Sequence, residues 1–122
     1  MFMNRTDLEI GSIVSDRNGK VFSIEKFGEN NKVFSHNGIS EYINFLLPVD
    51  ITGNMLISLG LNYDQRTGWF RWGKDLKKGI IRKSAGWVVR EIVNENDFLD
   101  HSPIKFIYEF QKKYKNEYSN NS

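Results

Sequence analysis

The chain has 122 residues, no cysteine, and 17 lysines and arginines against 15 aspartates and glutamates, which gives a net charge of +2. A chain of this length can bury a core without crosslinks, and the lack of cysteine excludes disulfides, thiol catalysis and cysteine-ligated metals. No apolar run approaches a signal-peptide core or the roughly 20 residues of a membrane-spanning helix. We therefore expect one domain over residues 1–122 in a reducing, cytoplasmic compartment.

Residues 7–51 have the composition of short β-strands separated by turns. Apolar runs such as VFSIEKF and KVFSH alternate with two Asn-Gly pairs, at Asn18-Gly19 and Asn37-Gly38. Asn-Gly favours the type I′ turn of a two-residue hairpin, because both residues tolerate a positive φ. The pattern predicts four strands in a small curled antiparallel sheet of SH3-like size, ended by Pro48.

A short crossover helix is predicted for residues 52–60. Thr52 has the side chain of an N-cap, Met55, Leu56 and Leu59 follow at helical spacing, and Gly60 stands where a left-handed residue ends a helix. We expect this helix to cover the open side of the first sheet, since a small sheet is marginally stable alone.

Residues 62–94 are predicted to form a second, basic β-hairpin region. The runs RTGWFRW, GIIRKS and GWVVREIV are rich in aromatic and β-branched residues and are separated by glycines. Side chains alternate along a strand, so Trp69, Phe70 and Trp72 cannot share one face, and at least one is exposed or buried on a second face. Residues 94–100, NENDFLD, are expected to form an acidic loop.

The last predicted element is a helix over residues 102–118, packed on the sheet. Ser102-Pro103 matches an N-cap followed by proline in the first turn. Ile104, Ile107 and Phe110 begin an apolar stripe at three- and four-residue spacing. Together the elements predict an α+β fold.

The sequence offers little for catalysis, and we expect a protein that is not an enzyme and holds no cofactor or metal. His36 and His101 are the only histidines, and the acids Glu91, Glu95, Asp97 and Asp100 lack the glycine and spacing of a calcium-binding loop. A hydrolase that uses Asp97, Asp100 and His101 is the one catalytic alternative.

The strongest functional signal is the segment of residues 66–90, which holds eight cations, one acid and all three tryptophans. Lysine and arginine neutralise phosphates and tryptophan stacks on bases, but tryptophan and arginine are equally the preferred residues of protein interfaces. In a third interpretation the tryptophans are core residues and the cations a solvated face. The candidate binding residues are Arg66, Trp69, Arg71, Trp72, Lys74, Lys77, Lys78, Arg82, Lys83, Trp87 and Arg90.

Gly79 is expected to lie in a turn within this segment. Lys77, Lys78, Arg82 and Lys83 would then reach outward from one place. Replacing all four with glutamate is predicted to abolish binding to an acidic or phosphate-bearing target while the protein stays folded.

Three stretches carry a resemblance: LEIGSIV at 8–14, LPVDITGNMLISLGL at 47–61 and IKFIYEFQKKYKN at 104–116. In this order they resemble a family of small proteins common in phages and prophages of the Bacteroidota. The chain departs from the family pattern at Glu9, which replaces a basic residue, at Ser12, which replaces an asparagine, and at Lys112-Lys113, which replace a polar-apolar pair.

Small phage proteins of this kind include inhibitors of host defence, and the chain is similar in size and style to an anti-CRISPR protein against type VI-B, RNA-targeting effectors. The resemblance implies a non-enzymatic inhibitor in the host bacterial cytoplasm that binds an RNA-guided effector and interferes with its guide or target RNA. The alternative is a small module of phage origin that binds RNA or another single-stranded nucleic acid. RNA would be contacted directly or through the partner protein.

Overall fold

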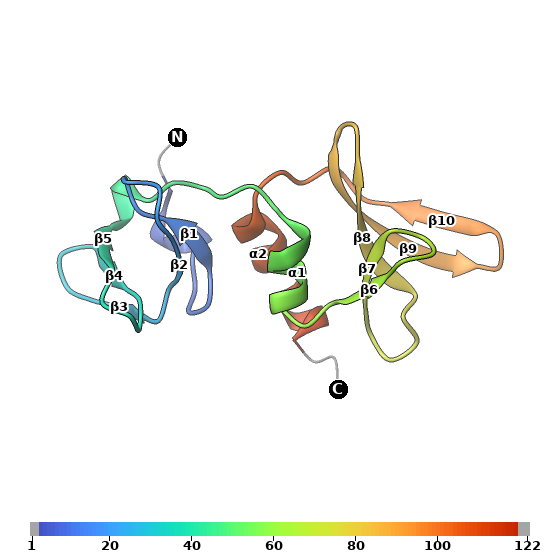
Figure 1. Ribbon diagram of the computed structural model, residues 1–122, viewed down its shortest axis with the longest axis horizontal. Helices are drawn as coiled ribbons and strands as arrows, with labels where there is room; N and C mark the ends of the chain where they lie inside the picture. The colour runs from blue at the N-terminus through green and yellow to red at the C-terminus, as the bar shows by residue number, and fades with distance from the viewer. Residues whose placement is uncertain (1–2, 120–122) are drawn as a thin grey trace. The chain divides into compact units, whose positions relative to one another are not determined.

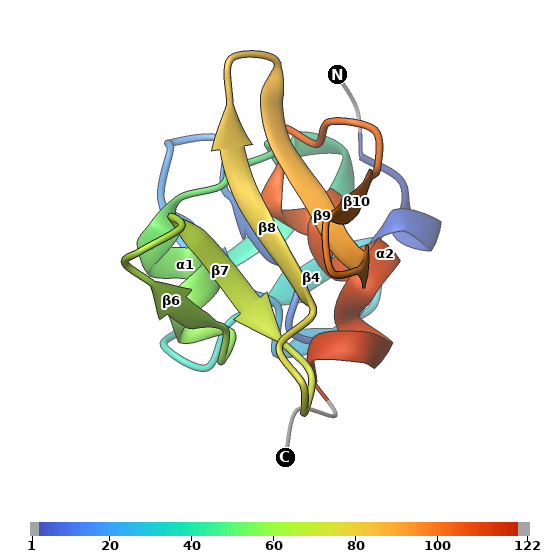
Figure 2. The same cartoon turned by 90° about the vertical axis from the view of Figure 1, so that its right-hand side faces the viewer.

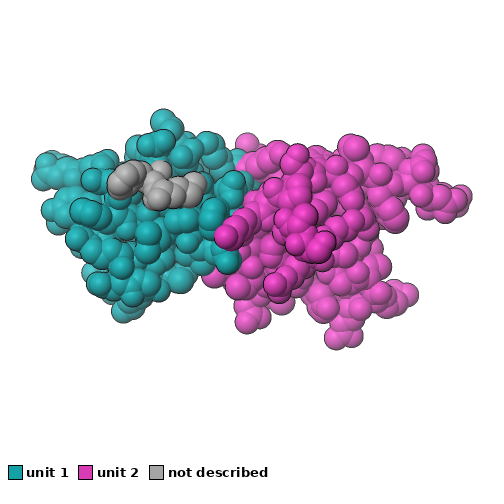
Figure 3. All heavy atoms as spheres, turned by 90° about the horizontal axis from the view of Figure 1, so that it is seen from above, with its two compact units in different colours: residues 1–50, 106–112 teal, residues 51–105, 113–122 magenta. Residues whose placement is uncertain are grey.

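The computed structural model describes residues 3–119 and confirms an α+β fold (Figure 1). Within these residues, ten short strands form three antiparallel sheets, accompanied by two α-helices. The chain divides into two compact units (Figure 3). The first unit comprises residues 1–50 and 106–112, and the second comprises residues 51–105 and 113–122.

The first unit contains five strands in two sheets, where the sequence predicted four strands in one. A two-stranded and a three-stranded sheet are joined by short connections, with a 3₁₀ turn at each end of the region. The elements are η1 (Arg5–Asp7), β1 (Ile13–Ser15), β2 (Val21–Ser23), β3 (Lys26–Phe27), β4 (Lys32–Phe34), β5 (Ser40–Tyr42) and η2 (Ile43–Phe45). The expected long last strand stops at Tyr42, because η2 turns Ile43 into the core, where Leu46 follows it.

Both Asn-Gly turns lie where the sequence predicts them, but they are not type I′ turns. Only the glycines have a positive φ, 86° at Gly19 and 89° at Gly38. In the first turn Asp16 Oδ1 accepts hydrogen bonds from the backbone N–H groups of Asn18 and Lys20, at 2.9 and 2.8 Å. The aspartate side chain thus favours a wider turn in which only the glycine is left-handed.

The core of the first unit is completed by a helix from the far end of the chain. Its buried residues are Met3, Leu8, Val14, Phe22, Ile24, Val33, Ile43, Leu46 and Tyr108. Tyr108 lies on α2 (Ile107–Tyr118), one turn before the buried Gln111. The Gln111 amide accepts a hydrogen bond from Ile13 N–H and donates one to the carbonyl of Gly11, both at 2.8 Å. A buried polar side chain is thereby satisfied on both sides.

The second unit is a five-stranded antiparallel sheet with α1 (Gly53–Ser58) against β7. In spatial order the strands are β10 (Asp97–Asp100), β9 (Gly86–Asn94), β8 (Lys78–Lys83), β7 (Trp69–Trp72) and β6 (Asn62–Asp64). The caps of α1 confirm the predicted helix, but it belongs to the second unit and packs against β7, whereas the sequence predicted that it would cover the first sheet. The Thr52 hydroxyl accepts a hydrogen bond from Met55 N–H at 3.2 Å, and Gly60 has a φ of 97°.

Two predicted boundaries are wrong. Residues 94–100 are not a loop, because Asp97–Asp100 pair with β9 as an edge strand. The last helix begins at Ile107 and not at Ser102-Pro103, because Ile104 pairs with Trp87 and Phe106 pairs with Asp50 in extended bridges. Glu109 caps the actual start by accepting a hydrogen bond from Phe106 N–H at 3.2 Å. No helix in residues 3–119 is long and apolar enough to cross a membrane.

Ile107 tests the packing of α2. Its side chain is fully buried in the helix's first turn. We expect Ile107→Ala to lower the free energy of unfolding by about 2–5 kcal/mol, because it deletes buried methyl groups and leaves a cavity. Chemical denaturation measures the change. Lys113→Ala, at an exposed position, is the control, and its free energy of unfolding should stay within about 0.5 kcal/mol of wild type. A loss below about 0.5 kcal/mol for Ile107→Ala would contradict this packing.

Arg17 and Glu41 form the best-defined ion pair of the first unit. The guanidinium donates from Nη2 and Nε to the two carboxylate oxygens, at 2.8 and 3.1 Å. The backbone N–H groups of Arg17 and Tyr42 donate to the same carboxylate at 3.0 and 2.9 Å. The hydrogen bonds from the Arg17 guanidinium have the largest effect on the pKa of Glu41. Together with the backbone hydrogen bonds they outweigh burial, which raises it, and lower the pKa from 4.5 to about 2.

This pair predicts a pH dependence of stability. The pKa of Glu41 is lower in the folded protein than in the unfolded chain, so the stabilisation is present above pH 4.5 and is lost as the pH falls towards 2. We expect Glu41→Gln to cost roughly 1–3 kcal/mol at pH 7, since half-exposed Arg17 is partly screened by solvent. Denaturation of both proteins from pH 7 to pH 2 should show the difference narrowing below pH 4.5. A difference that is constant with pH would rule out the ionised pair as its source.

Candidate functional site

The candidate binding residues do not gather on one surface, because they come from strands whose side chains alternate. Pairing of β7, β8 and β9 puts Trp69, Arg71, Gly79 and Arg90 on one face of the sheet, with Phe98 and Asp100 from β10. This face, which we call the outer face, is turned towards the viewer in Figure 2, with α1 behind the sheet. The eleven candidates divide into four on the outer face (Trp69, Arg71, Lys83, Arg90), four on the inner face (Trp72, Lys78, Arg82, Trp87) and three in loops (Arg66, Lys74, Lys77).

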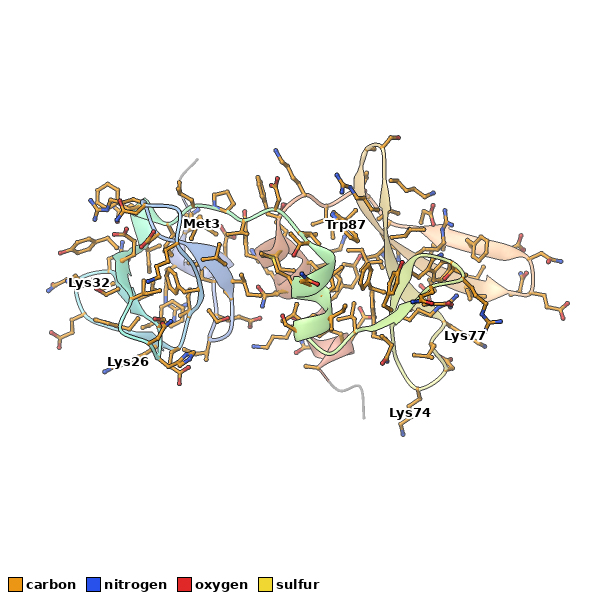
Figure 4. The ribbon with its side chains drawn as sticks, viewed as in Figure 1. Met3, Lys26, Lys32, Lys74, Lys77 and Trp87 are labelled. Atoms are coloured by element: carbon orange, nitrogen blue, oxygen red, sulfur yellow. The ribbon has the colours of Figure 1, made fainter. Side chains whose placement is uncertain are left out.

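Two of the three tryptophans are on the inner face. Trp72 is 2% exposed and its indole lies 5.8 Å from the ring of Tyr114. Trp87, labelled in Figure 4, is half-buried. Its ring lies 5.8 Å from that of Phe70, on the same face as fully buried Ile80. Trp72 therefore belongs to the core of the second unit and is removed from the candidate contact surface.

Gly79 is not in a turn. It lies inside β8, where it pairs with Arg71 on one side and Arg90 on the other. The four cations expected around it therefore do not converge. Lys78 donates to Glu117 at 2.6 Å and Lys83 donates to Asp100 at 3.1 Å, so two of the four are in ion pairs.

The organising feature of the outer face is the indole of Trp69, which crosses the sheet over Gly79. A Cβ on Gly79 would lie 3.0 Å from Trp69 Cε3, closer than side chains ordinarily approach, so glycine at this position makes room for the ring. The guanidinium of Arg71 lies 4.2 Å from the indole and that of Arg90 lies 5.8 Å from it. Phe98 adds an edge contact at 5.7 Å, and Trp69 is left 4% exposed.

Two carboxylates that were not among the predicted binding residues hold these arginines. Asp64 accepts from Arg71 Nε at 3.2 Å, and Asp100 accepts from Arg90 Nε and Nη2 at 2.6 and 2.9 Å. The hydrogen bonds from Arg90, and then from Lys83, hold the pKa of Asp100 well below its usual range. The pKa of Asp64 is lowered first by a hydrogen bond from the backbone N–H of Arg66 and then by one from the Thr67 hydroxyl. The positive charge of Arg71 lowers it further. Neither acid lies within residues 66–90, so only the strand pairing could have identified them.

The remaining cations lie in the loops beside this face. Among residues 3–119, Arg66, Lys74 and Lys77 make no ion pair, and the side chains of Lys74 and Lys77 extend away from the strands (Figure 4). An open hollow of about 720 Å³ lies next to them, and its lining includes Arg66, Arg71 and Leu76. Leu76 has a φ of 54°, an unfavourable conformation for leucine, and its carbonyl accepts from Arg71 Nη1 at 2.8 Å.

Exposed apolar side chains accompany the charges. Phe98 is 55% exposed on the outer face and Leu76 is 38% exposed at the hollow. Exposed large apolar side chains can mark a contact surface. The second unit therefore combines anchored arginines, loop cations and apolar contacts.

The residues of the catalytic alternative do not come together: Asp100 and His101 point to opposite faces of the sheet. Asp100 faces outward into its ion pairs, whereas the next residue, His101, points to the inner face, where Nδ1 lies 2.9 Å from the Tyr114 hydroxyl. Glu91 is the carboxylate near His101, at 3.9 Å from Nε2. Within the described residues, no three side chains of the His, Asp and Glu types form a group that could hold a metal ion.

Comparison with known proteins adds no relative: no family model, no curated protein and no solved structure matches the chain.

Gly79 provides the test of the outer-face packing. We expect Gly79→Ala to lower the free energy of unfolding by about 1–3 kcal/mol, because its Cβ meets the Trp69 indole and the Phe70 carbonyl oxygen, 3.1 Å away. The same substitution should cost less in a Trp69→Ala background, where the ring is gone. Chemical denaturation of the two single variants and the double variant measures this coupling. Strictly additive costs would mean that the indole is not the obstacle.

Proposed function

We propose that the protein acts by binding, without catalysis, and that its contact surface is the outer face of the sheet formed by β6–β10 with the adjoining loops. The observation that carries the proposal is Trp69 fixed beneath Arg71 and Arg90, with Phe98 exposed beside them. Rigid aromatic and arginine side chains next to exposed apolar residues are the composition of protein interface hot spots.

A protein partner is favoured over a nucleic acid for two reasons. Of the tryptophans predicted to stack on bases, Trp69 is covered and Trp72 is buried on the inner face. A nucleic-acid backbone carries a row of phosphates and needs several unneutralised cations, but Arg90 and Lys83 share the charge of Asp100. Direct binding of single-stranded RNA remains the second candidate, carried by the loop cations alone.

Charge points to an acidic partner surface. The second unit has eleven lysines and arginines against seven acids, a net charge of +4, whereas the first unit has six against eight, a net charge of −2. A positive surface speeds the encounter with an acidic one and discriminates against basic partners. The phage-protein resemblance of the sequence makes an RNA-guided type VI-B effector the first partner to test, with the protein as its inhibitor.

The test is a charge reversal restricted to cations that form no ion pair within residues 3–119. Arg66, Lys74 and Lys77 replaced together by glutamate should weaken binding to the effector–guide RNA complex by about tenfold or more, and raised salt should weaken wild-type binding. Gel filtration and surface plasmon resonance measure complex formation. Reversing Lys78 and Lys83 is avoided, because glutamates there would face Glu117 and Asp100.

Lys20, Lys26 and Lys32 in the first unit provide a control with the same change in charge, and this variant should bind as wild type does. Unchanged binding by the Arg66, Lys74 and Lys77 variant would reject the proposed surface. A different result would favour the second candidate. The wild-type protein would bind a fluorescent single-stranded RNA but not the effector, and the Arg66, Lys74 and Lys77 variant would lose the RNA binding.

A further inference from the structure

We infer that Arg71 and Arg90 form a carboxylate-binding site above Trp69, which takes an aspartate or glutamate side chain from the protein partner. The inference rests on the proposed function, which it extends from a surface to a chemical group. Its basis is the geometry of the two guanidinium groups and the nitrogen that each of them still has free.

The internal carboxylates position the arginines without using all of their donors. Arg90 uses Nε and Nη2 on Asp100, and Arg71 uses Nε on Asp64 and Nη1 on the Leu76 carbonyl. A guanidinium has donors on all three nitrogens, so Arg90 Nη1 and Arg71 Nη2 remain. In the described part of the chain neither nitrogen has a partner.

Both guanidinium groups lie against the same indole on the outer face, Arg71 at 4.2 Å and Arg90 at 5.8 Å from its centroid. The side chains of Arg71 and Arg90 are only 15% and 18% exposed, and their rotamers are fixed by ion pairs and by the ring. A fixed, partly desolvated donor loses little entropy on binding and makes a stronger charge-assisted hydrogen bond than a mobile surface lysine.

The local charge suits a single anion. Three cations, Arg71, Arg90 and Lys83, face two carboxylates, Asp64 and Asp100, which leaves one positive charge. A single carboxylate neutralises that charge.

The side chains beside the two arginines, Phe98 and Trp69, favour a protein carboxylate over an RNA phosphate. Phe98 lies 5.0 Å from the Arg90 guanidinium and is 55% exposed, so it offers an apolar contact to the residues flanking an acidic side chain. The covered Trp69 ring offers no platform for the bases that would accompany a phosphate.

The first test uses the wild-type protein and defined probes. Acetyl-glutamate amide and its neutral match, acetyl-glutamine amide, are titrated against protein labelled with ¹⁵N, and the Nε–H signals of Arg71 and Arg90 are followed by NMR. We expect saturable shifts of both signals with the glutamate probe, no saturable shift with the glutamine probe, and no shift at Arg5. Shifts with oligouridylate or with inorganic phosphate but not with the glutamate probe would overturn the inference in favour of a phosphate site. No saturable shift with any probe would overturn it outright.

The second test separates the inference from the proposed function. Arg71→Lys with Arg90→Lys keeps both charges but removes the fork of donors, so binding to the effector complex should weaken by about tenfold or more. Arg5→Lys is the matched control, because Arg5 also lies over an aromatic ring, Phe27, and donates to a backbone carbonyl. Backbone NMR spectra establish that each variant is folded, and the single variants replace the double one if it is not.

Wild-type affinity in a folded Arg71→Lys, Arg90→Lys variant would overturn the carboxylate site. If the Arg66, Lys74 and Lys77 charge reversal still abolished binding, the proposed surface would stand without it. If neither set of substitutions changed binding, the surface itself would be wrong.

Discussion

The packing of one indole ring across a strand that has no side chain beneath it determines the second unit's outer face. Trp69 lies over Gly79, so a ring from β7 reaches the side chains of Arg90 on β9 and Phe98 on β10. One exposed face of a five-stranded sheet thereby acquires a small core of its own. Fixed arginines then lie on a rigid base, which is the arrangement a binding surface needs to avoid losing entropy when a partner arrives.

The two edge strands of that sheet contribute equivalent electrostatic contacts. β6 supplies Asp64 to Arg71 and β10 supplies Asp100 to Arg90. An exposed edge strand readily pairs with other chains, and aspartates together with the irregular register between Asp97 and Phe98 oppose such pairing on β10. The same acids therefore protect an edge and orient an arginine.

Local signals in the sequence predicted the local features, whereas the site depended on strand pairing. Thr52 and Gly60 specified α1 because a cap is a contact between near neighbours. Ser102-Pro103 gave an equally good signal and was wrong, because Ile104 pairs with Trp87 in an extended bridge that no local pattern encodes. Residues 66–90 were identified as basic and aromatic, but sequence alone could not show that Trp72 is buried, or that Asp64 and Asp100 pair with the segment's arginines.

The helix α2 has a consequence for how this chain can be divided or inherited. Its first half, with Tyr108 and Gln111, belongs to the first unit, and its second half, with Tyr114, belongs to the second. Neither unit is a continuous stretch of sequence, so no single cut separates them, and a fragment ending at residue 50 would lack part of its own core and the buried amide that binds Ile13. Exchange of one continuous segment of sequence therefore cannot transfer either unit whole.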